Sequence, residues 1–229
     1  MPVRLPFLAF RAGFGTFSAS AMIRLLTLCL LFSAAFAEEE WIPLFDGKSL
    51  EGWTTLDGDP VTRGWEVRDG AIYRAGRGGD IITTAEFQDF VLEFEWKISE
   101  RGNSGVKYRV QRNIGIEYQV LDDQEHPDRR NPTHRAASFY DLLAAPDSKP
   151  LKPVGEWNHA KIVADGPKLE HWLNGELVAS LDQSTEDWKK RFEASKYRKR
   201  ENFGRPASPI LLQDHGDAAW FRNLRIRKL

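Results

Sequence analysis

Charged and amide side chains alternate with apolar ones through residues 102–123, GNSGVKYRVQRNIGIEYQVLDD. Successive side chains of a strand lie on opposite faces, so this pattern predicts a β-hairpin with one apolar and one ionic face. We expect the turn to occupy residues 111–115. The partners expected across the ionic face are Arg109 with Glu117 and Lys107 with Gln119. A slip of one residue would reverse both faces, so the pattern favours this register.

Glu117 is the side chain of this hairpin best suited to acid–base chemistry. Arg109 opposite would keep its carboxylate ionised and able to accept a proton. In that interpretation the ionic face is the floor of a polar cleft. In the alternative it is a solvent-facing surface, whose cross-strand ion pairs each contribute roughly a few tenths of a kcal/mol. The hairpin by itself leaves both interpretations open.

Two other short stretches could bring polar groups to the same cleft. Residues 213–216, Gln-Asp-His-Gly, lie between two expected strands, where a tight loop could present an imidazole and a carboxylate at a sheet rim. Residues 103–105, Asn-Ser-Gly, are either a turn or a set of hydroxyl-binding groups beside the cleft. Such residues also form ordinary turns, so neither stretch identifies a site alone.

The histidines and acidic residues allow a metal site without defining one. His126, His134 and His215 fall in expected loops, whereas the other two histidines fall in expected strands, where a structural role is the simpler explanation. The acidic loop over residues 122–128 could bind a hard cation or remain solvated. The sequence contains no metal-ligand motif of fixed spacing, no nucleophile elbow and no phosphate-binding glycine loop.

Alternating apolar segments separated by turn signals recur along the chain, which is typical of an all-β sandwich or barrel. Residues 90–98 alternate most strictly, so we expect a central strand with one buried face. Asn174-Gly175 lies between two such segments and predicts a tight hairpin. Residues 137–143 are expected to form a further strand.

One short peripheral helix is expected late in the chain. Residues 184–187, Ser-Thr-Glu-Asp, have the composition of a helix N-terminus, and Trp188 and Phe192 follow one turn apart. No internal repeat or shift in composition marks a second domain. We therefore expect residues 38–229 to form a single domain.

The first 37 residues have the pattern of a secretory signal peptide, with a small-x-small cleavage site that ends at Ala37. A basic start at residues 22–24 precedes a short apolar run, so Met22 is a candidate initiator and residues 1–21 a candidate extension. The apolar run is too short to span a bilayer as a stable helix. Cys29 in that run follows a leucine, which a lipoprotein cleavage site would not have. The sequence predicts a periplasmic or secreted protein without a membrane anchor.

Composition limits the partners of the exported chain. Removing residues 1–37 takes away three arginines and no acid, which changes the formal net charge from −1 to −4. No basic patch stands out, so nucleic acid and anionic membranes are not expected partners. Residues 38–229 contain no cysteine. A hydrophobic core must therefore hold the fold, and a chain of this size can bury roughly 70% of its unfolded surface.

Residues 44–53, LFDGKSLEGW, resemble the opening signature of the 3-keto-disaccharide hydrolase family. Further stretches fit that family in the same order along nearly all of residues 38–229. These are GNSG at 102–105, residues 115–122, GEWN at 155–158, LNG at 173–175, QDHG at 213–216 and FRN at 221–223. Each stretch is weak alone, but their joint order is specific. The resemblance implies a concanavalin A-like jelly roll that acts on sugars oxidised to a ketone at carbon 3.

That substrate chemistry implies roles for the candidate residues. A ketone at carbon 3 acidifies the proton at carbon 2, so a base can remove it, the enolate can expel the group on carbon 1, and water can add back. We assign Glu117 as the base and His215 as the acid for the leaving oxygen. Arg109 and Lys107 are candidates for stabilising the oxyanion, as is a divalent metal near His134 and Glu117. No other cofactor is expected.

The remaining polar side chains of the hairpin and the 213–216 loop are expected to contact the carbohydrate substrate. These are Asn103, Ser104, Lys107, Tyr108, Gln119, Gln213 and Asp214. Glycoside hydrolysis by two carboxylates fits less well, because Glu93 and Glu95 share a strand face without the third acid of a laminarinase-like site. A non-catalytic carbohydrate-binding module remains open, since eight tryptophans could stack on sugar rings. A purely structural sandwich domain is the third alternative.

Overall fold

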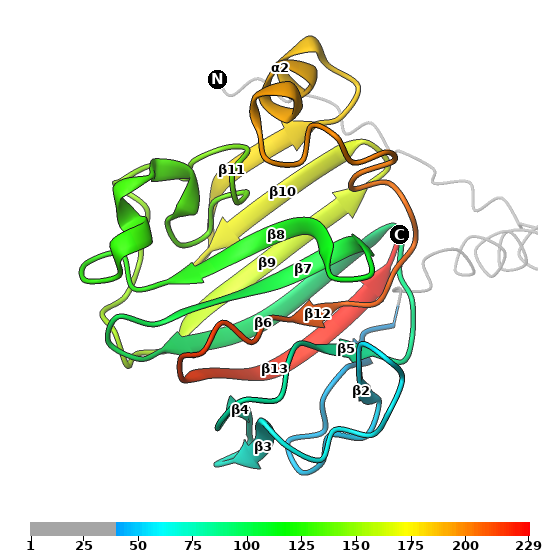
Figure 1. Cartoon of the computed structure of the whole chain (residues 1–229), viewed down its shortest axis with the longest axis vertical. Helices are drawn as coiled ribbons and strands as arrows, with labels where there is room; N and C mark the ends of the chain where they lie inside the picture. The colour runs from blue at the N-terminus through cyan, green and yellow to red at the C-terminus, as the bar shows by residue number, and fades with distance from the viewer. Residues whose placement is uncertain (1–39) are drawn as a thin grey trace, which may run out of the picture. The chain divides into compact units, whose positions relative to one another are not determined.

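Two antiparallel β-sheets face each other in the structure, a computed structural model that describes residues 40–229 (Figure 1). The larger sheet has the order β11 (Glu176–Asp182), β10 (Lys168–Leu173), β9 (Asn158–Asp165), β6 (Phe90–Ile98), β13 (Ala219–Lys228), β4 (Ala71–Arg74), β3 (Trp65–Arg68), and β1 (Ile42–Pro43) also pairs with β13. The smaller sheet has the order β2 (Trp53–Thr55), β5 (Ile81–Thr83), β12 (Leu211–Leu212), β7 (Asn103–Gln111), β8 (Ile114–Leu121). The expected all-β class is confirmed.

Helical segments lie only in the connections between the described strands. The 3₁₀ helices η1 (Pro127–Arg130) and η2 (Pro132–His134) follow β8, and the α-helix α2 (Glu186–Ala194) follows β11 beyond the sheet edge (Figure 1). Thr185 begins α2, because its Oγ1 accepts a hydrogen bond from the Trp188 backbone N at 3.2 Å. The predicted short peripheral helix is confirmed. Among residues 40–229 no helix is long and apolar enough to cross a membrane.

The core lies between the sheets and is supplied by the alternation seen in the sequence. β6 lies between β9 and β13, and its inward side chains are each at most 3% exposed. These side chains are Phe90, Leu92, Phe94, Trp96 and Ile98. Their rings meet the smaller sheet edge-on, with Phe90 against Tyr108 at 5.7 Å and Phe94 against Tyr118 at 5.5 Å between ring centroids. Burying each such side chain contributes roughly 1.5–3 kcal/mol, so the prediction of a central, half-buried strand is confirmed.

The β7–β8 hairpin forms as predicted, but its expected register is wrong. Lys107 pairs with Glu117 and Tyr108 with Ile116, and Gln111 closes the hairpin against Ile114. The register shifts between Tyr108 and Gln111, where Arg109 adopts a positive φ of 48°. This β-bulge inserts an extra residue into β7 and turns the Arg109 side chain away from the ionic face. Strict alternation cannot anticipate a bulge, which is why Arg109 was expected opposite Glu117.

Two further local predictions have opposite outcomes. Asn174 and Gly175 both have positive φ, 48° and 91°, as a tight hairpin turn requires, and β10 and β11 pair across them. Residues 137–143 do not form a strand. They make only isolated bridges through Phe139, and with positive φ values at Ala137 and Asp141 the chain turns along the edge of β8, to which it is hydrogen-bonded. The predicted signal peptide and extension lie outside the described residues.

Candidate functional site

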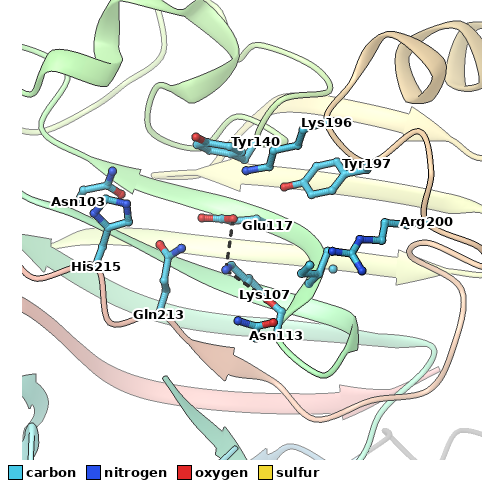
Figure 2. A pocket seen from close by; sticks show the side chains of 12 residues that line it. Asn103, Lys107, Asn113, Glu117, Tyr140, Lys196, Tyr197, Arg200, Gln213 and His215 are labelled. Carbon is cyan, nitrogen blue, oxygen red and sulfur yellow. Dashed lines mark hydrogen bonds and ion pairs between the residues drawn. The ribbon is translucent and has the colours of Figure 1, made fainter. Parts of the chain in front are cut away.

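A cavity of about 280 Å³ opens on the ionic face of the β7–β8 hairpin (Figure 2). Its floor carries Glu117 and Lys107, and the loop that follows β12 contributes Gln213 and His215. Two other segments form the opposite wall: the turn at residues 137–143 and the segment that follows α2. That wall is formed by Tyr140, Lys196, Tyr197 and Arg200. The predicted polar cleft therefore exists, and its walls come from segments of the chain far apart in sequence.

Glu117 is buried in the floor of this cavity, with only 4% of its surface exposed. Its Oε2 lies 3.7 Å from Nζ of Lys107, which also donates to the Asn113 carbonyl at 3.4 Å. Burial raises the pKa of Glu117, while the charges of Lys107, Lys196 and His215 pull it down. The cations that support the ionised carboxylate are thus two lysines rather than the expected Arg109.

The Asn-Ser-Gly stretch of β7 shapes the floor in three ways. Asn103 lines the cavity, and its Oδ1 accepts a hydrogen bond from Nε2 of the buried Gln119 at 3.3 Å. Ser104 donates through Oγ to the Gln213 carbonyl at 2.8 Å, which ties β7 to the loop after β12. A Cβ atom at Gly105 would lie 2.5 Å from Oε1 of Glu117, so glycine leaves the space that the carboxylate occupies. Ser104 and Gln119 therefore position other residues of the site.

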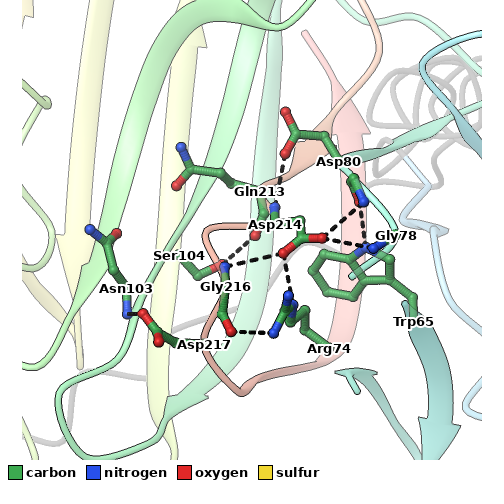
Figure 3. Close-up of polar contacts among 11 residues, drawn as sticks. Trp65, Arg74, Gly78, Asp80, Asn103, Ser104, Gln213, Asp214, Gly216 and Asp217 are labelled. Carbon is green, nitrogen blue, oxygen red and sulfur yellow. Dashed lines mark hydrogen bonds and ion pairs between the residues drawn. The ribbon is translucent and has the colours of Figure 1, made fainter. Parts of the chain in front are cut away.

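Asp214 holds the loop that presents His215 (Figure 3). Its carboxylate accepts hydrogen bonds from the backbone N atoms of Gly78 and Gly79 at 3.0 and 2.8 Å and from Nε of Arg74 at 2.7 Å. Partial burial raises the pKa of Asp214, but these bonds outweigh it and hold the pKa below its usual value. Because its oxygens are engaged in this way, Asp214 positions the loop, whereas the expectation was a sugar contact.

Gln213 and His215 are the two side chains that this loop turns into the cavity (Figure 2). Within residues 40–229, Oε1 of Gln213 is buried and accepts no hydrogen bond. An amide oxygen in that state is suited to bind a sugar hydroxyl. His215 is solvent-exposed at the mouth, and its ring lies 6.4 Å from that of His126 between centroids.

The sequence pattern did not predict the residues that form the wall opposite the floor. Tyr140 reaches it because its backbone N donates to the Glu117 carbonyl at 3.2 Å. Lys196 reaches it because its backbone N donates to Oδ2 of Asp141 at 2.6 Å, which fastens the segment after α2 to the turn at residues 137–143. The signal in the sequence was an aromatic residue, Tyr197, inside an otherwise basic exposed run. Such a residue indicates packing against the body of the protein.

Besides the positioning residues Ser104, Gln119 and Asp214, three more predicted site residues do not line the cavity. Arg109 donates to the Gln88 and Gly166 carbonyls at 3.1 and 2.7 Å and pairs with Asp89 at 2.9 Å, so it ties β7 to two turns. Tyr108 is buried in the core with its hydroxyl 3.1 Å from Nε2 of His171. Burial lowers the pKa of His171 to about 3, which makes it the structural histidine expected from its strand position.

His134, the third, stacks on the outer side of Tyr140 with ring centroids 4.1 Å apart. Its ring nitrogens lie 3.7 Å from Asp128 and 3.6 Å from Asp141. Over residues 40–229, no group of three or more His, Cys, Asp or Glu side chains is arranged to hold a metal ion. The pairing of His134 with Glu117 around a metal therefore has no support from this geometry.

The two facing sheets define a concanavalin A-like jelly roll with a polar cavity on its smaller sheet. A Bacillus subtilis protein with a galectin-like fold has a TM-score of 0.52 at 11% identity, covers 82% of this chain and 94% of its own, and supports the fold alone. The chain belongs to the 3-keto-alpha-glucoside-1,2-lyase-like domain family, whose family model matches residues 40–227. The resemblance found in the sequence is confirmed.

Named relatives are consistent with this membership. A 3-keto-disaccharide hydrolase of Bacteroides thetaiotaomicron is 34% identical over 228 residues, which span 82% of this chain and 78% of the relative. A crystal structure of a proposed glycosyl hydrolase from Parabacteroides distasonis has a TM-score of 0.77 at 32% identity and covers 86% of this chain and 98% of its own. A second such structure from that organism has a TM-score of 0.66 at 28% identity, over 83% and 100% of the two chains. These relatives carry the names of glycoside hydrolases, and this chain shares their fold and much of their sequence.

Proposed function

We propose that the protein cleaves 3-keto-glycosides or 3-keto-disaccharides, with Glu117 as the base that removes the proton from carbon 2. The observation that carries this proposal is a carboxylate buried in the floor of a polar cavity, with Lys107 3.7 Å away as its cation. The relative named a 3-keto-disaccharide hydrolase supports the substrate class. Arg109 lies outside the cavity and has no part in this proposal.

The reaction proceeds in two stages. Glu117 takes the carbon 2 proton, the electron pair moves to the carbon 3 oxygen as an enolate, and the enolate then expels the oxygen on carbon 1. The resulting enone adds water, with hydroxide at carbon 1 and a proton at carbon 2, so the net change is hydrolysis. His215 at the mouth protonates the leaving oxygen. Asn103 and Gln213 bind the hydroxyl groups of the ring.

This reaction needs a ketone, which gives a direct test. The purified protein is incubated with a 3-keto-glucoside and, separately, with the parent glucoside that carries a hydroxyl at carbon 3. We expect cleavage of the keto-glucoside only, because the parent has no acidified proton at carbon 2. Cleavage of both at similar rates, or binding of the keto-glucoside without cleavage, would refute the proposal. Repeating the assay with a chelator decides whether a metal contributes.

We also propose that the protein is exported by the segment that ends at Ala37. The support is the cleavage pattern together with the absence of cysteine from residues 38–229. N-terminal sequencing of the protein recovered from its host should begin at Glu38. A sequence that begins at Met1 or Met22 would contradict export by this route.

A further inference from the structure

The segment that follows α2 forms a wall of the cavity, although the helix itself lies at the periphery of the fold (Figure 2). We infer that Lys196 in this segment is a second catalytic residue, whose ammonium group binds the carbon 3 oxygen of the substrate and stabilises the enolate. This inference rests on the proposed function and deepens it. It gives a chemical role to Lys196, which lies in a run of basic residues.

The fold fixes the backbone of Lys196 firmly. Its N atom donates to Oδ2 of Asp141 at 2.6 Å, and the next residue, Tyr197, is buried with its ring 4.3 Å from that of Phe203 between centroids. Phe203 stacks in turn with Trp188 and Phe192 of α2. The helix and its aromatic cluster therefore anchor the segment that carries Lys196, which accounts for the presence of α2.

The side chain of Lys196 is held by aromatic rings and leaves its charge available. Nζ lies 4.0 Å from the ring centroid of Tyr140 and 5.1 Å from that of Tyr197. Considering residues 40–229, no carboxylate oxygen lies within 4.0 Å of this ammonium group. A cation held by ring faces without an anionic partner is suited to accept the negative oxygen of an enolate.

Lys107 is less suited to that task because it already has two partners. Its Nζ lies 3.7 Å from the Glu117 carboxylate and 3.4 Å from the Asn113 carbonyl, and its side chain is 11% exposed. Lys107 thus supports the base from the floor. Lys196 lies on the wall that faces that base (Figure 2). A sugar ring between floor and wall can then present its carbon 2 proton to Glu117 and its carbon 3 oxygen to Lys196.

Lys196 and Glu117 each shift the pKa of the other, so the role of Lys196 can be tested through the pH dependence of turnover. Displacement of part of its hydration lowers the pKa of Lys196 below its ordinary 10.5, while Glu117, Asp141 and Asp128 raise it and Lys107 lowers it. Burial raises the pKa of Glu117, with Lys107, Lys196 and His215 opposing and Asp80 adding to the rise. Turnover should therefore fall as the pH drops through the raised pKa of Glu117, whose ionised form is the base.

The experiment measures kcat and kcat/KM against pH with a 3-keto-glucoside for wild type, Lys196→Met, Lys196→Arg and Lys199→Met. Methionine keeps the apolar contact with the two tyrosine rings, so the wall should stay folded, which circular dichroism and Tm verify. Lys199 is exposed in the same run outside the cavity and serves as the matched control.

We expect Lys196→Met to lose kcat by roughly a hundredfold, as removal of an oxyanion partner does. Its acid limb should move to higher pH, since a cation that lowers the pKa of Glu117 is gone. Lys196→Arg should keep the acid limb in place and retain most of the wild-type kcat, because arginine keeps a cation at this position. Lys199→Met should match wild type.

Unchanged kcat in Lys196→Met, a change in KM alone, or an unmoved acid limb would overturn the role of Lys196 while leaving the proposed function intact. Absence of turnover by the wild type on any 3-keto-glycoside would overturn the proposed function and this inference together. The wild-type measurement thus separates the two failures.

Discussion

Two faces of this sandwich carry carboxylates paired with cations across neighbouring strands. The pairs on the two faces differ in distance and in solvent exposure. On the outer face of the larger sheet, Glu93 pairs with Arg225 and Glu95 with Arg222, each at 2.6 Å and each with solvent access to both partners. On the hairpin face of the smaller sheet, Glu117 lies 3.7 Å from Lys107 and both are buried.

The difference comes from what covers each face. The turn at residues 137–143 and the segment after α2 close over Glu117, whereas the outer-face pairs stay in solvent, where each contributes at most about 1 kcal/mol. In the solvated pairs an arginine engages each carboxylate at 2.6 Å. In the cavity the looser pair leaves a buried carboxylate whose pKa is raised, which is why we propose that the same strand pattern serves stability on one face and chemistry on the other.

Removing one carboxylate from each face should affect turnover very differently. Glu117→Gln should keep the fold and lose turnover of 3-keto-glycosides by roughly a hundredfold or more, since a general base is lost. Glu95→Gln, the control on the outer face, should retain wild-type turnover. Steady-state kinetics on both variants provide the check. Normal turnover by Glu117→Gln would show that the hairpin face is not the active one.

We expect a smaller loss of turnover when His215, the proposed acid, is replaced. His215→Ala should slow cleavage by roughly a hundredfold when the leaving group is an alkyl alcohol and far less when it is 4-nitrophenol, which leaves without protonation. His159, exposed on the outer face, supplies the control variant His159→Ala. Rates for a series of 3-keto-glucosides plotted against leaving-group pKa give the test. Equal slowing across the series would remove His215 from the acid role.

The Glu117 carboxylate can also be displaced without being removed, by filling the space that Gly105 leaves beside it. Gly105→Ala places a Cβ atom 2.5 Å from Oε1, so the carboxylate must shift. We expect turnover to fall roughly tenfold with the fold retained, because a misplaced base reacts poorly. Gly76 has open space and ordinary φ, so Gly76→Ala should be neutral. An unaltered kcat in Gly105→Ala would mean that the position of this carboxylate is not critical.

The smallest effect on turnover is expected at Arg109. Arg109→Met leaves the Gln88 and Gly166 carbonyls and Asp89 without their partner, which should lower the free energy of unfolding by about 2 kcal/mol. The kcat of the folded protein should stay at the wild-type value. Chemical denaturation and kinetics on the same preparation separate the two quantities. A large drop in kcat at unchanged stability would restore Arg109 to the site.

The sequence predicted those features that depend on local pattern. Alternation at Phe90–Ile98 gave the central strand, Asn174-Gly175 gave the hairpin turn, and the Thr185 cap gave α2. Glu117, Gln213 and His215 were expected to share one cleft and do so.

What the sequence did not predict depends on contacts made outside the local pattern. The bulge at Arg109 is fixed by bonds to turns about 20 and 57 residues away, which no pattern within β7 reveals. Residues 137–143 resemble a strand because Phe139 is buried, yet they form a turn along the edge of β8. Lys196 enters the cavity through a bond to Asp141, 55 residues earlier in the chain.

Removal of the carbon 2 proton by Glu117 leaves an isotopic record in the product. The wild type cleaves a 3-keto-glucoside in D₂O, and NMR of the released 3-keto sugar at early times measures deuterium at carbon 2, with an enzyme-free sample as control. We expect one deuterium at carbon 2 of each product molecule, and Glu117→Gln should lose this exchange together with cleavage. A product that keeps its original hydrogen at carbon 2 would contradict removal of that proton by Glu117.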